Sequence, residues 1–220
     1  MKKIVVLVSG RGSNMIALLD ACSEQRWNAR IDAVISDRPH APACDLARSR
    51  GVRLEVIDAN GAASREVFNQ LLGDTLACLQ PDLVVLAGFM RILPTELVEQ
   101  YPLRMLNIHP SLLPAFPGLH THRRALESGT RIHGATVHYV SPELDAGPVI
   151  AQAALAVKDV DTESTLAARV LRAEHQILPL AVQWHLDGRL RVDGSRARLD
   201  SPAAGETQSK IGRASCRERV

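Results

Sequence analysis

Short, uninterrupted apolar runs that alternate with amphipathic segments constrain the fold of this chain more than any other feature. The run "KIVVLVS" at residues 3–9 is apolar between its two ends and much shorter than an ordinary helix, which is typical of a strand covered on both faces. Residues 14–24 then show helical spacing. Further strands are predicted at 30–36, 52–58, 81–89 and 104–108, and helices at 41–51, at 64–79 and after Pro94. Repeated strand–helix–strand units predict a doubly wound, mainly parallel α/β sheet.

The pattern changes after residue 130. Two strands are predicted at 133–140 and 147–157, and the short polar loop between them favours antiparallel pairing. One long helix is predicted over 162–188, with Thr162 as its N-cap, Pro179 as a candidate kink and Gly188 at its end. Residues 1–190 are interpreted as one domain, and 191–220 as a polar tail that is disordered or left over from cloning.

Composition excludes several classes of protein. The chain has 220 residues, of which 46% are hydrophobic and 3% aromatic, so one sizeable aliphatic core is expected. The net charge is +2, but residues 191–220 alone carry seven basic and four acidic side chains. The body therefore has no basic surplus to hold a polyanion, and no nucleic-acid partner is expected.

Cysteine usage and the N-terminus indicate the compartment. The four cysteines form no C-x-x-C pair, and reduced thiols in a reducing compartment are the preferred interpretation. The apolar run near the N-terminus spans five residues, too few for a signal-peptide core or a membrane span. We therefore expect a cytoplasmic enzyme with no membrane partner.

The loop "SGRGSN" joins the first predicted strand to the first helix. Glycines there allow a tight turn, and the N–H groups that open the helix favour an anion. Gly12, Ser13 and Asn14 are therefore a candidate phosphate site. The loop lacks the G-x-x-x-x-G-K-[ST] pattern of a P-loop. A turn without a ligand remains an alternative.

The same loop partly resembles a dinucleotide-binding fingerprint. Gly10 and Gly12 fit that pattern, and Asp37 ends the second strand where a ribose-binding acid is expected. The third glycine position, however, is Met15, whose side chain would obstruct close packing against a pyrophosphate.

The segment "MLNIHPSLLPAFPGLH", residues 105–120, contains the candidate catalytic groups. Asn107 and His109 lie two residues apart at the carboxyl end of a strand, so they share one face of the sheet at the edge where such sheets bind ligands. An amide and an imidazole together supply two donors for a developing oxyanion. Asp145 follows in the loop between the two late strands, and a carboxylate beside His109 would favour its protonated form. The alternative is that these side chains only hydrogen-bond loop backbone.

Five histidines fall between residues 109 and 138, and they raise the question of a metal. No H-E-x-x-H motif is present and no cysteine lies near them in the sequence, so no metal site is predicted. His120 and His122 are interpreted as loop or substrate contacts at a helix start.

Five segments in order resemble the phosphoribosylglycinamide formyltransferases, which belong to the folate-dependent formyltransferases of purine synthesis. They are "VSGRGSN", "LAGFMRIL", "LNIHPSLLPAFPGLHTHRRAL", "HGATVHYV" and "ELDAGPVIAQ". The resemblance covers residues 3 to 190 approximately and implies a Rossmann-like formyltransferase fold. It implies that the formyl group of 10-formyltetrahydrofolate is transferred to the amine of glycinamide ribonucleotide, with the folate as co-substrate and without a metal.

The resemblance also implies roles for individual residues. Asn107, His109 and Asp145 match the catalytic trio of the family, Gly12, Ser13 and Asn14 its phosphate loop, Glu174 the carboxylate that receives the glycinamide amine, and Arg65, Met90, Arg91, Ile92, Leu93 and Asn107 its folate contacts. One departure is Pro142, in a late loop where a non-proline residue is usual. Proline removes an N–H donor, which puts folate affinity or loop motion in question.

Four other functions are alternatives to this one. The methionyl-tRNA formyltransferases resemble this chain but carry an additional tRNA-binding domain, and the formyltetrahydrofolate hydrolases carry an additional N-terminal domain. Formylation of a sugar amine is a weaker alternative. A non-catalytic folate or nucleotide sensor has no need of Asn107, His109 and Asp145 together.

Overall fold

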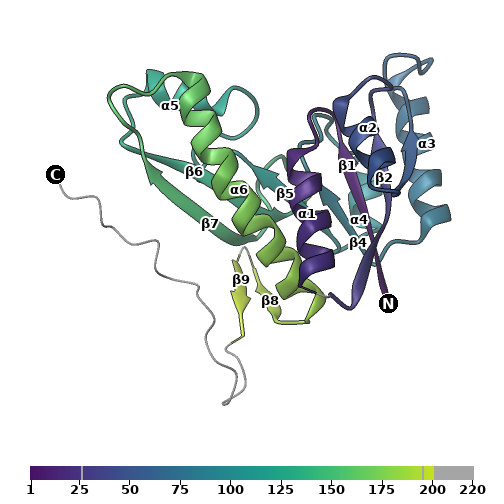
Figure 1. The fold of residues 1–220 in the computed structure, drawn as a ribbon. Helices are drawn as coiled ribbons and strands as arrows, with labels where there is room; N and C mark the ends of the chain where they lie inside the picture. The colour runs from purple at the N-terminus through teal and green to yellow at the C-terminus, as the bar shows by residue number, and fades with distance from the viewer. Residues whose placement is uncertain (26, 195, 201–220) are drawn as a thin grey trace.

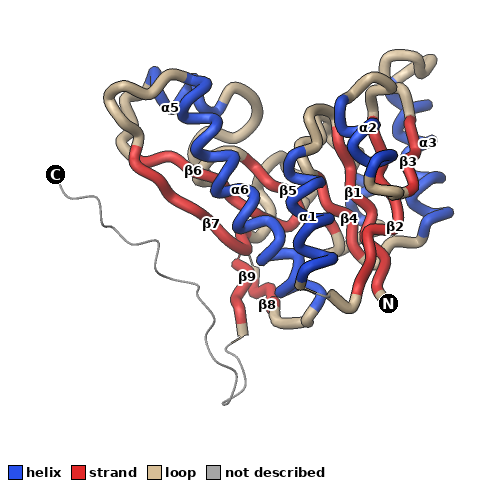
Figure 2. Tube along the Cα trace, in the orientation of Figure 1, coloured by secondary structure: helices blue, strands red, loops and turns tan. Residues whose placement is uncertain are grey.

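The computed structural model of the chain describes residues 1–25, 27–194 and 196–200. Its strands are β1 (Lys2–Val8), β2 (Ala29–Ser36), β3 (Arg53–Val56), β4 (Leu83–Leu86), β5 (Met105–His109), β6 (Ile132–Tyr139), β7 (Val149–Ala156), β8 (Leu190–Asp193) and β9 (Arg196–Leu199). Its helices are α1 (Ser13–Glu24), α2 (Pro42–Ser49), α3 (Arg65–Leu79), α4 (Thr95–Glu99), α5 (Thr121–Glu127) and α6 (Glu163–Leu186). Figures 1 and 2 show the helices packed on both sides of a twisted sheet.

The strands form one sheet in the order β3-β2-β1-β4-β5-β6-β7-β9-β8. The first five strands in this order run parallel to one another, whereas β6 is antiparallel to both β5 and β7. The predicted doubly wound sheet with antiparallel late strands is therefore confirmed. The strand order reverses between β1 and β4, which is where open α/β sheets form a binding crevice.

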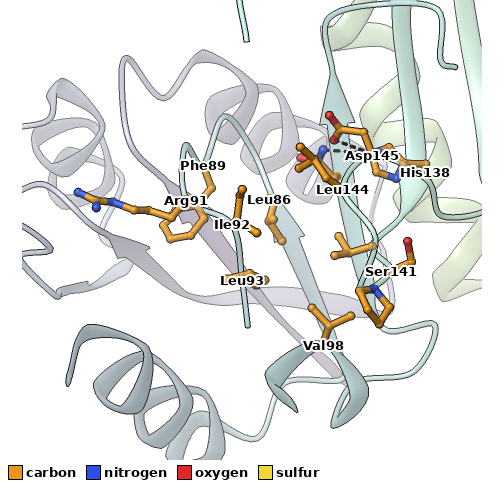
Figure 3. A pocket seen from close by; sticks show the side chains of 13 residues that line it. Leu86, Phe89, Arg91, Ile92, Leu93, Val98, His138, Ser141, Leu144 and Asp145 are labelled. Carbon is orange, nitrogen blue, oxygen red and sulfur yellow. Dashed lines mark hydrogen bonds and ion pairs between the residues drawn. The ribbon is translucent and has the colours of Figure 1, made fainter. Parts of the chain in front are cut away.

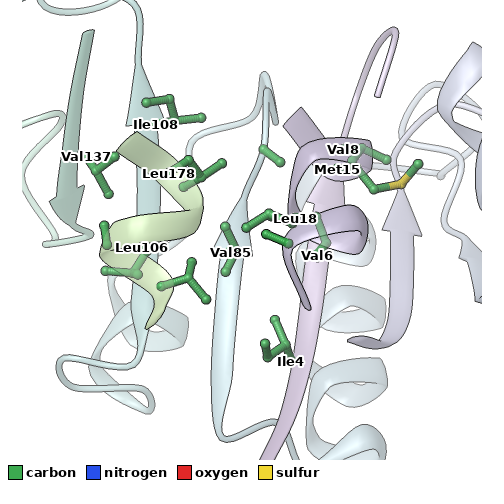
Figure 4. Packing of buried hydrophobic residues seen from close by; sticks show 14 of the residues in the cluster. Ile4, Val6, Val8, Met15, Leu18, Val85, Leu106, Ile108, Val137 and Leu178 are labelled. Carbon is green, nitrogen blue, oxygen red and sulfur yellow. The ribbon is translucent and has the colours of Figure 1, made fainter. Parts of the chain in front are cut away.

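Alternate side chains of the central strands pack into two separate cores. On one face, Val6 and Leu106 contact a layer formed by α1, α2 and α6, and Figure 4 shows Leu18 and Leu178 reaching down onto these strands. On the other face, Val5 and Leu7 pack against α3 and α4. Burial on both faces explains why the central strands read as continuous apolar runs.

Helix starts follow the predicted capping residues. The Ser64 hydroxyl accepts a hydrogen bond from the Val67 N–H at 3.3 Å, and Thr162 and Thr165 form a reciprocal capping box at the start of α6. Helix α6 continues through Pro179 and packs beside α1. None of the described helices is long and apolar enough to cross a membrane.

The described structure continues past residue 191, where the polar tail is predicted to begin. Strand β8 extends to Asp193, and β9 pairs antiparallel with β8 and joins β7 through Val149 and Arg196. Val192 and Ala197 pack against the main core, but strands of four residues are too short to show a period in the sequence. The rest of the predicted tail, residues 201–220, lies outside the described residues.

Candidate active site

The loops that follow β1 and β4 meet at the point where the strand order reverses. The loop after β1 leads to α1 on one face of the sheet, and the loop after β4 leads to α4 on the other. Two hydrogen bonds connect these loops at their first residues. The Ser9 N–H donates to the Gly88 carbonyl at 3.1 Å, and the Met90 N–H donates to the Ser9 hydroxyl at 2.8 Å. The two segments that follow Ser9 and Gly88 therefore form the walls of the crevice expected of this fold.

The glycine-rich loop has the conformation that an anion site needs. Gly12 has φ of 78°, and a Cβ on it would lie 2.8 Å from the Cβ of Ala43, so only glycine fits. The Ala43 N–H fixes the loop by donating to the Gly10 carbonyl at 3.1 Å. Helix α1 has no side-chain cap and no acidic residue in its first turn. Its first N–H groups therefore remain available to an anion.

Asn14 connects this loop to the long helix α6. Its amide nitrogen donates to a carboxylate oxygen of Glu174 at 2.6 Å, and both residues are 7% exposed. Burial raises the pKa of the Glu174 carboxyl, while the Asn14 hydrogen bond and nearby Arg11 act in the opposite direction. The Asn14 carbonyl oxygen has no hydrogen-bond partner among the described residues. The pair is thus an under-satisfied buried polar site, which favours binding of a further polar group.

Asn107 is held by a histidine on the neighbouring strand. The antiparallel register of β5 and β6 places Asn107 opposite His138, and the Asn107 amide nitrogen lies 3.1 Å from His138 Nε2. His138 Nδ1 donates to the Tyr139 carbonyl at 2.8 Å, which leaves Nε2 as the acceptor of the Asn107 hydrogen bond. Burial lowers the pKa of His138 and keeps it neutral. One amide hydrogen of Asn107 is thereby fixed, and the other has no acceptor among the described residues.

His109 lies between two acceptors. Its Nε2 is 3.0 Å from the Phe116 carbonyl oxygen, and its Nδ1 is 3.5 Å from a carboxylate oxygen of Asp145. A carbonyl only accepts, so Nε2 carries a proton, and a second proton on Nδ1 would face the carboxylate. Each ring nitrogen of His109 therefore faces an acceptor, and the predicted proximity of Asp145 and His109 is confirmed.

The Asp145 loop is held close to the sheet by unusual backbone geometry. Asp145 has a left-handed φ of 52°, and its carboxylate accepts the Gly118 N–H at 2.8 Å. A Cβ on Gly147 would lie 1.9 Å from the Tyr139 carbonyl oxygen, so a glycine is required for this close approach. The loop between β6 and β7 and the loop after β5 are therefore joined through Asp145.

Two cavities open beside this trio. The larger, about 340 Å³, is lined by Met90, Arg91, Ile92, Asn107, His109 and Asp145 together with the loop 118–122 and other neighbours. The smaller, about 90 Å³, adds deeper apolar residues that include Leu86, Leu93 and Val98, as Figure 3 shows. Together they form a largely apolar recess that ends at Asn107 and Asp145, a form typical of small-molecule sites.

A histidine pair supports one wall of the larger cavity. His122 Nδ1 lies 3.2 Å from His133 Nε2, and the Phe116 ring packs edge-on against His133. Burial lowers the pKa of His133 to about 4, with His122 acting in the same direction. Both rings are therefore neutral near pH 7, and they hold the segment whose carbonyl receives the His109 hydrogen bond.

The structure brings together most, but not all, of the predicted site residues. Met90, Arg91 and Ile92 line the larger cavity and Leu93 the smaller one, next to the trio. Pro142 also lines the smaller cavity. Arg65 lines neither cavity, and its guanidinium lies 3.4 Å from the Ile92 carbonyl oxygen. Gly12, Ser13, Asn14 and Glu174 do not line these two cavities either. Ser9, just before the glycine-rich loop, hydrogen-bonds Gly88 and Met90 in the wall of the larger cavity.

Sequence reasoning assigned no role to three residues that shape the recess. His138 orients Asn107, while Phe89 and Leu144 form apolar wall. For His138 the signal is the pairing register, because a residue opposite Asn107 must lie beside it. That register depends on which strand neighbours β5, which periodicity within the chain does not reveal.

Comparisons with known proteins agree with this geometry. The family model described as "Formyl transferase" matches residues 2–182. Phosphoribosylglycinamide formyltransferase of Escherichia coli is 47% identical over 90% of this chain and 93% of its own. The crystal structure of glycinamide ribonucleotide transformylase 1 from Symbiobacterium toebii superposes with a TM-score of 0.88 at 44% identity, over 91% of this chain and 95% of that one. A formyltetrahydrofolate deformylase from Pseudomonas syringae has a TM-score of 0.85 at 26% identity, over 91% of this chain and 66% of that one.

Proposed function

This chain belongs to the formyl transferase family, and we propose that it transfers the formyl group of 10-formyltetrahydrofolate to the amine of glycinamide ribonucleotide, a step of purine nucleotide biosynthesis. The observation that carries the proposal is the trio of Asn107, His109 and Asp145 at the inner end of an apolar recess. A flat folate ring system suits the recess, and its formyl group would then reach the trio.

The trio supplies what acyl transfer requires. The amine nitrogen attacks the formyl carbon, and negative charge develops on the formyl oxygen. The second amide hydrogen of Asn107 donates to that oxyanion, and the positive charge of a protonated His109 beside it adds electrostatic stabilisation. A proton lost from the attacking amine reaches N10 of the folate, through His109 or water, as the bond between carbon and N10 breaks. Asp145, 3.5 Å from Nδ1 of His109, holds the imidazole in place during this sequence.

The nucleotide substrate fits the other end of the crevice. In our proposal the phosphate binds the N–H groups of Gly12, Ser13 and Asn14, since α1 begins there without a cap. Glu174 receives the substrate amine, because its buried carboxylate has only Asn14 as a described hydrogen-bond donor. The folate contacts in this proposal are Arg65, Met90, Arg91, Ile92, Leu93 and Asn107. We assign no metal to the reaction.

Hydrolysis of formyl-folate is the alternative, since water can replace the amine at the same trio, and the Pseudomonas syringae deformylase shares the fold. The binding pair Asn14 and Glu174 favours an amine substrate. We place the enzyme in the cytoplasm, with support from the free thiols of the three described cysteines, Cys22, Cys44 and Cys78. Only small-molecule partners are proposed.

One assay tests the function. The protein is mixed with 10-formyltetrahydrofolate, with and without glycinamide ribonucleotide, and folate deformylation is followed by absorbance. We expect deformylation only when the ribonucleotide is present, with one formylated ribonucleotide formed per folate consumed. Equal rates without the ribonucleotide would establish a hydrolase instead, and no reaction in either mixture would refute both.

A further inference from the structure

The loop after β4 has exposed apolar side chains, which pack against few other residues of the protein. Met90 is 56% exposed and Ile92 is 54% exposed, and both line the larger cavity. Large apolar side chains facing water contribute little to fixing a loop, because they bury little area. The shape of this wall must therefore be set by other contacts.

Arg91, between those two residues, points the opposite way. In Figure 3 its side chain extends away from Leu144 and Asp145. Its Nε lies 3.0 Å from a carboxylate oxygen of Asp37, its Nη2 lies 3.2 Å from the Asn60 side-chain oxygen, and its guanidinium lies over the Phe68 ring, 5.7 Å from the centroid. The predicted contact of Arg91 with folate is thus left to its main chain, while its side chain serves as an anchor.

Asp37 is the fixed end of this anchor. Its side chain is fully buried at the carboxyl end of β2, while that of Arg91 is 36% exposed. The Asp37 N–H faces the Val8 carbonyl at 3.4 Å, and its own carbonyl accepts the Ala59 N–H at 3.1 Å. The other carboxylate oxygen has no hydrogen-bond partner among the described residues. A buried carboxylate with so few donors depends strongly on its one cation.

This placement also answers a question raised by the sequence. Asp37 ends the second strand where a dinucleotide-binding protein keeps its ribose-binding acid. Here the carboxylate is buried and paired with Arg91, so it is not available to a ribose hydroxyl. The Asp37 carboxylate instead forms an internal ion pair, which connects the end of β2 to the loop after β4.

We propose that Asp37 is a positioning residue for folate: by holding the Arg91 side chain, it sets the main chain of residues 90–93 in the conformation that binds the folate. This inference rests on the proposed function, because it takes residues 90–93 as folate contacts. Asp37 does not touch the reacting atoms. It acts on affinity for one substrate and leaves turnover and the ribonucleotide site unchanged.

A graded series of variants tests the proposal. Asp37→Ala removes both acceptors and should raise the KM for formyl-folate about tenfold, while Asp37→Asn keeps one neutral acceptor and should raise it about threefold. kcat and the KM for glycinamide ribonucleotide should stay within about twofold of wild type. Asp32→Asn is the matched control, because Asp32 lies on the same strand and is also paired with an arginine, Arg30, at 2.7 Å.

Arg91→Lys provides a second route if Asp37→Ala does not fold. Lysine keeps the charge but loses the fork that reaches Asp37 and Asn60 together, so the KM for formyl-folate should again rise. Combining Arg91→Lys with Asp37→Asn should add less than the sum of the two effects, since both act on one contact. Tetrahydrofolate binding by calorimetry should weaken in the same order as the KM values.

Three results would overturn the inference. They are a wild-type folate KM in folded Asp37→Asn and Arg91→Lys, an equal rise in both substrate KM values, and a rise in the Asp32→Asn control as large as in Asp37→Asn. Failure of the proposed function is recognised separately, because wild-type protein would then transfer no formyl group in the same assay.

Discussion

Two regions of the sheet build their parts of the site from different chemical groups. Strands β1 to β4 run parallel to one another, whereas β6 pairs antiparallel with its neighbours β5 and β7. Beside the parallel strands the proposed phosphate site is main chain: N–H groups at the start of α1, shaped by Gly12. Beside the antiparallel strands the proposed catalytic site consists of side chains: Asn107, which is held by His138, and the neighbouring His109 and Asp145.

The contrast has a physical origin. Parallel strands lead into helices, and a helix start offers unpaired N–H groups whatever its side chains are. Antiparallel neighbours instead place side chains directly opposite each other, and so pair Asn107 with His138. A site of the first kind should be sensitive to added charge or bulk, and one of the second kind to side-chain chemistry and to pH. Four predictions test this difference, ordered from the largest expected free energy to the smallest.

Acidification should destabilise the antiparallel region most. Burial lowers the pKa of His133 to about 4, below the ordinary value near 6.5. Between those pH values the unfolded chain binds a proton there and the folded chain does not, so the stabilisation is complete above about pH 6.5 and is lost as pH falls toward about 4. His133 alone should contribute up to ~3 kcal/mol.

Urea unfolding at a series of pH values measures this dependence. His133→Gln should flatten the curve between pH 6.5 and 4, because one titrating group is removed. His40→Gln, at an exposed histidine beside the parallel strands, is the control and should leave the slope unchanged. An equal slope in wild type and His133→Gln would contradict the assignment.

Loss of the Asp145 charge should have the next largest effect. Asp145→Asn keeps the shape, and asparagine tolerates the left-handed φ of 52°. We expect kcat to fall about a hundredfold, or ~2.7 kcal/mol, with little change in either KM. The control is Asp159→Asn, which removes an exposed carboxylate paired with Arg131. Turnover near the wild-type value would reduce Asp145 to a loop residue.

A negative charge at the start of α1 should separate binding from stability. Ser13→Glu should leave the melting temperature unchanged or raise it, since an acid in the first helical turn is favourable. The same charge should repel the phosphate and raise the KM for glycinamide ribonucleotide at least about tenfold, or ~1.4 kcal/mol. Ser23→Glu, in the last turn of α1, is the control. Gly12 is a poorer test because any side chain there meets Ala43.

Reorienting Asn107 should have the smallest effect. His138→Asn removes the acceptor for the Asn107 amide and should lower kcat about fivefold, the value of one hydrogen bond near 1 kcal/mol. His138→Gln places an acceptor near the lost Nε2 and should restore most of the activity. Should both variants lose turnover equally, His138 would be structural and would not position Asn107.

Much of the fold was predictable because it depends on local patterns. The parallel strands appear as apolar runs, the helix starts at Ser64 and Thr162 as capping residues, and Gly12 as a glycine that its backbone requires. The exception was the end of the domain. In β8 and β9 each strand has four residues, and the pairing of β9 with β7 depends on contacts distant in the sequence.

The site residues also differ in whether local patterns in the sequence could place them. Asn107 and His109 were placed on one face by their spacing, because strand side chains alternate. Asp145 lies 36 residues after His109, and spacing alone could not place it beside them. The pairing of β6 with β5 brings it to His109. The resemblance implies that Arg91 contacts folate, and only the tertiary structure shows that its side chain is paired with Asp37.

The sequence by itself therefore determined strands β1 to β7, the helices, the glycine-rich turn and the polar residues at the end of β5, since each follows from spacing within a few residues. The tertiary structure alone decided that His138 fixes Asn107, that Glu174 meets Asn14 and that Asp37 holds Arg91. Those pairs lie 31, 160 and 54 residues apart in the chain. The order of the strands sets which of these distant side chains meet, and no local period records that order.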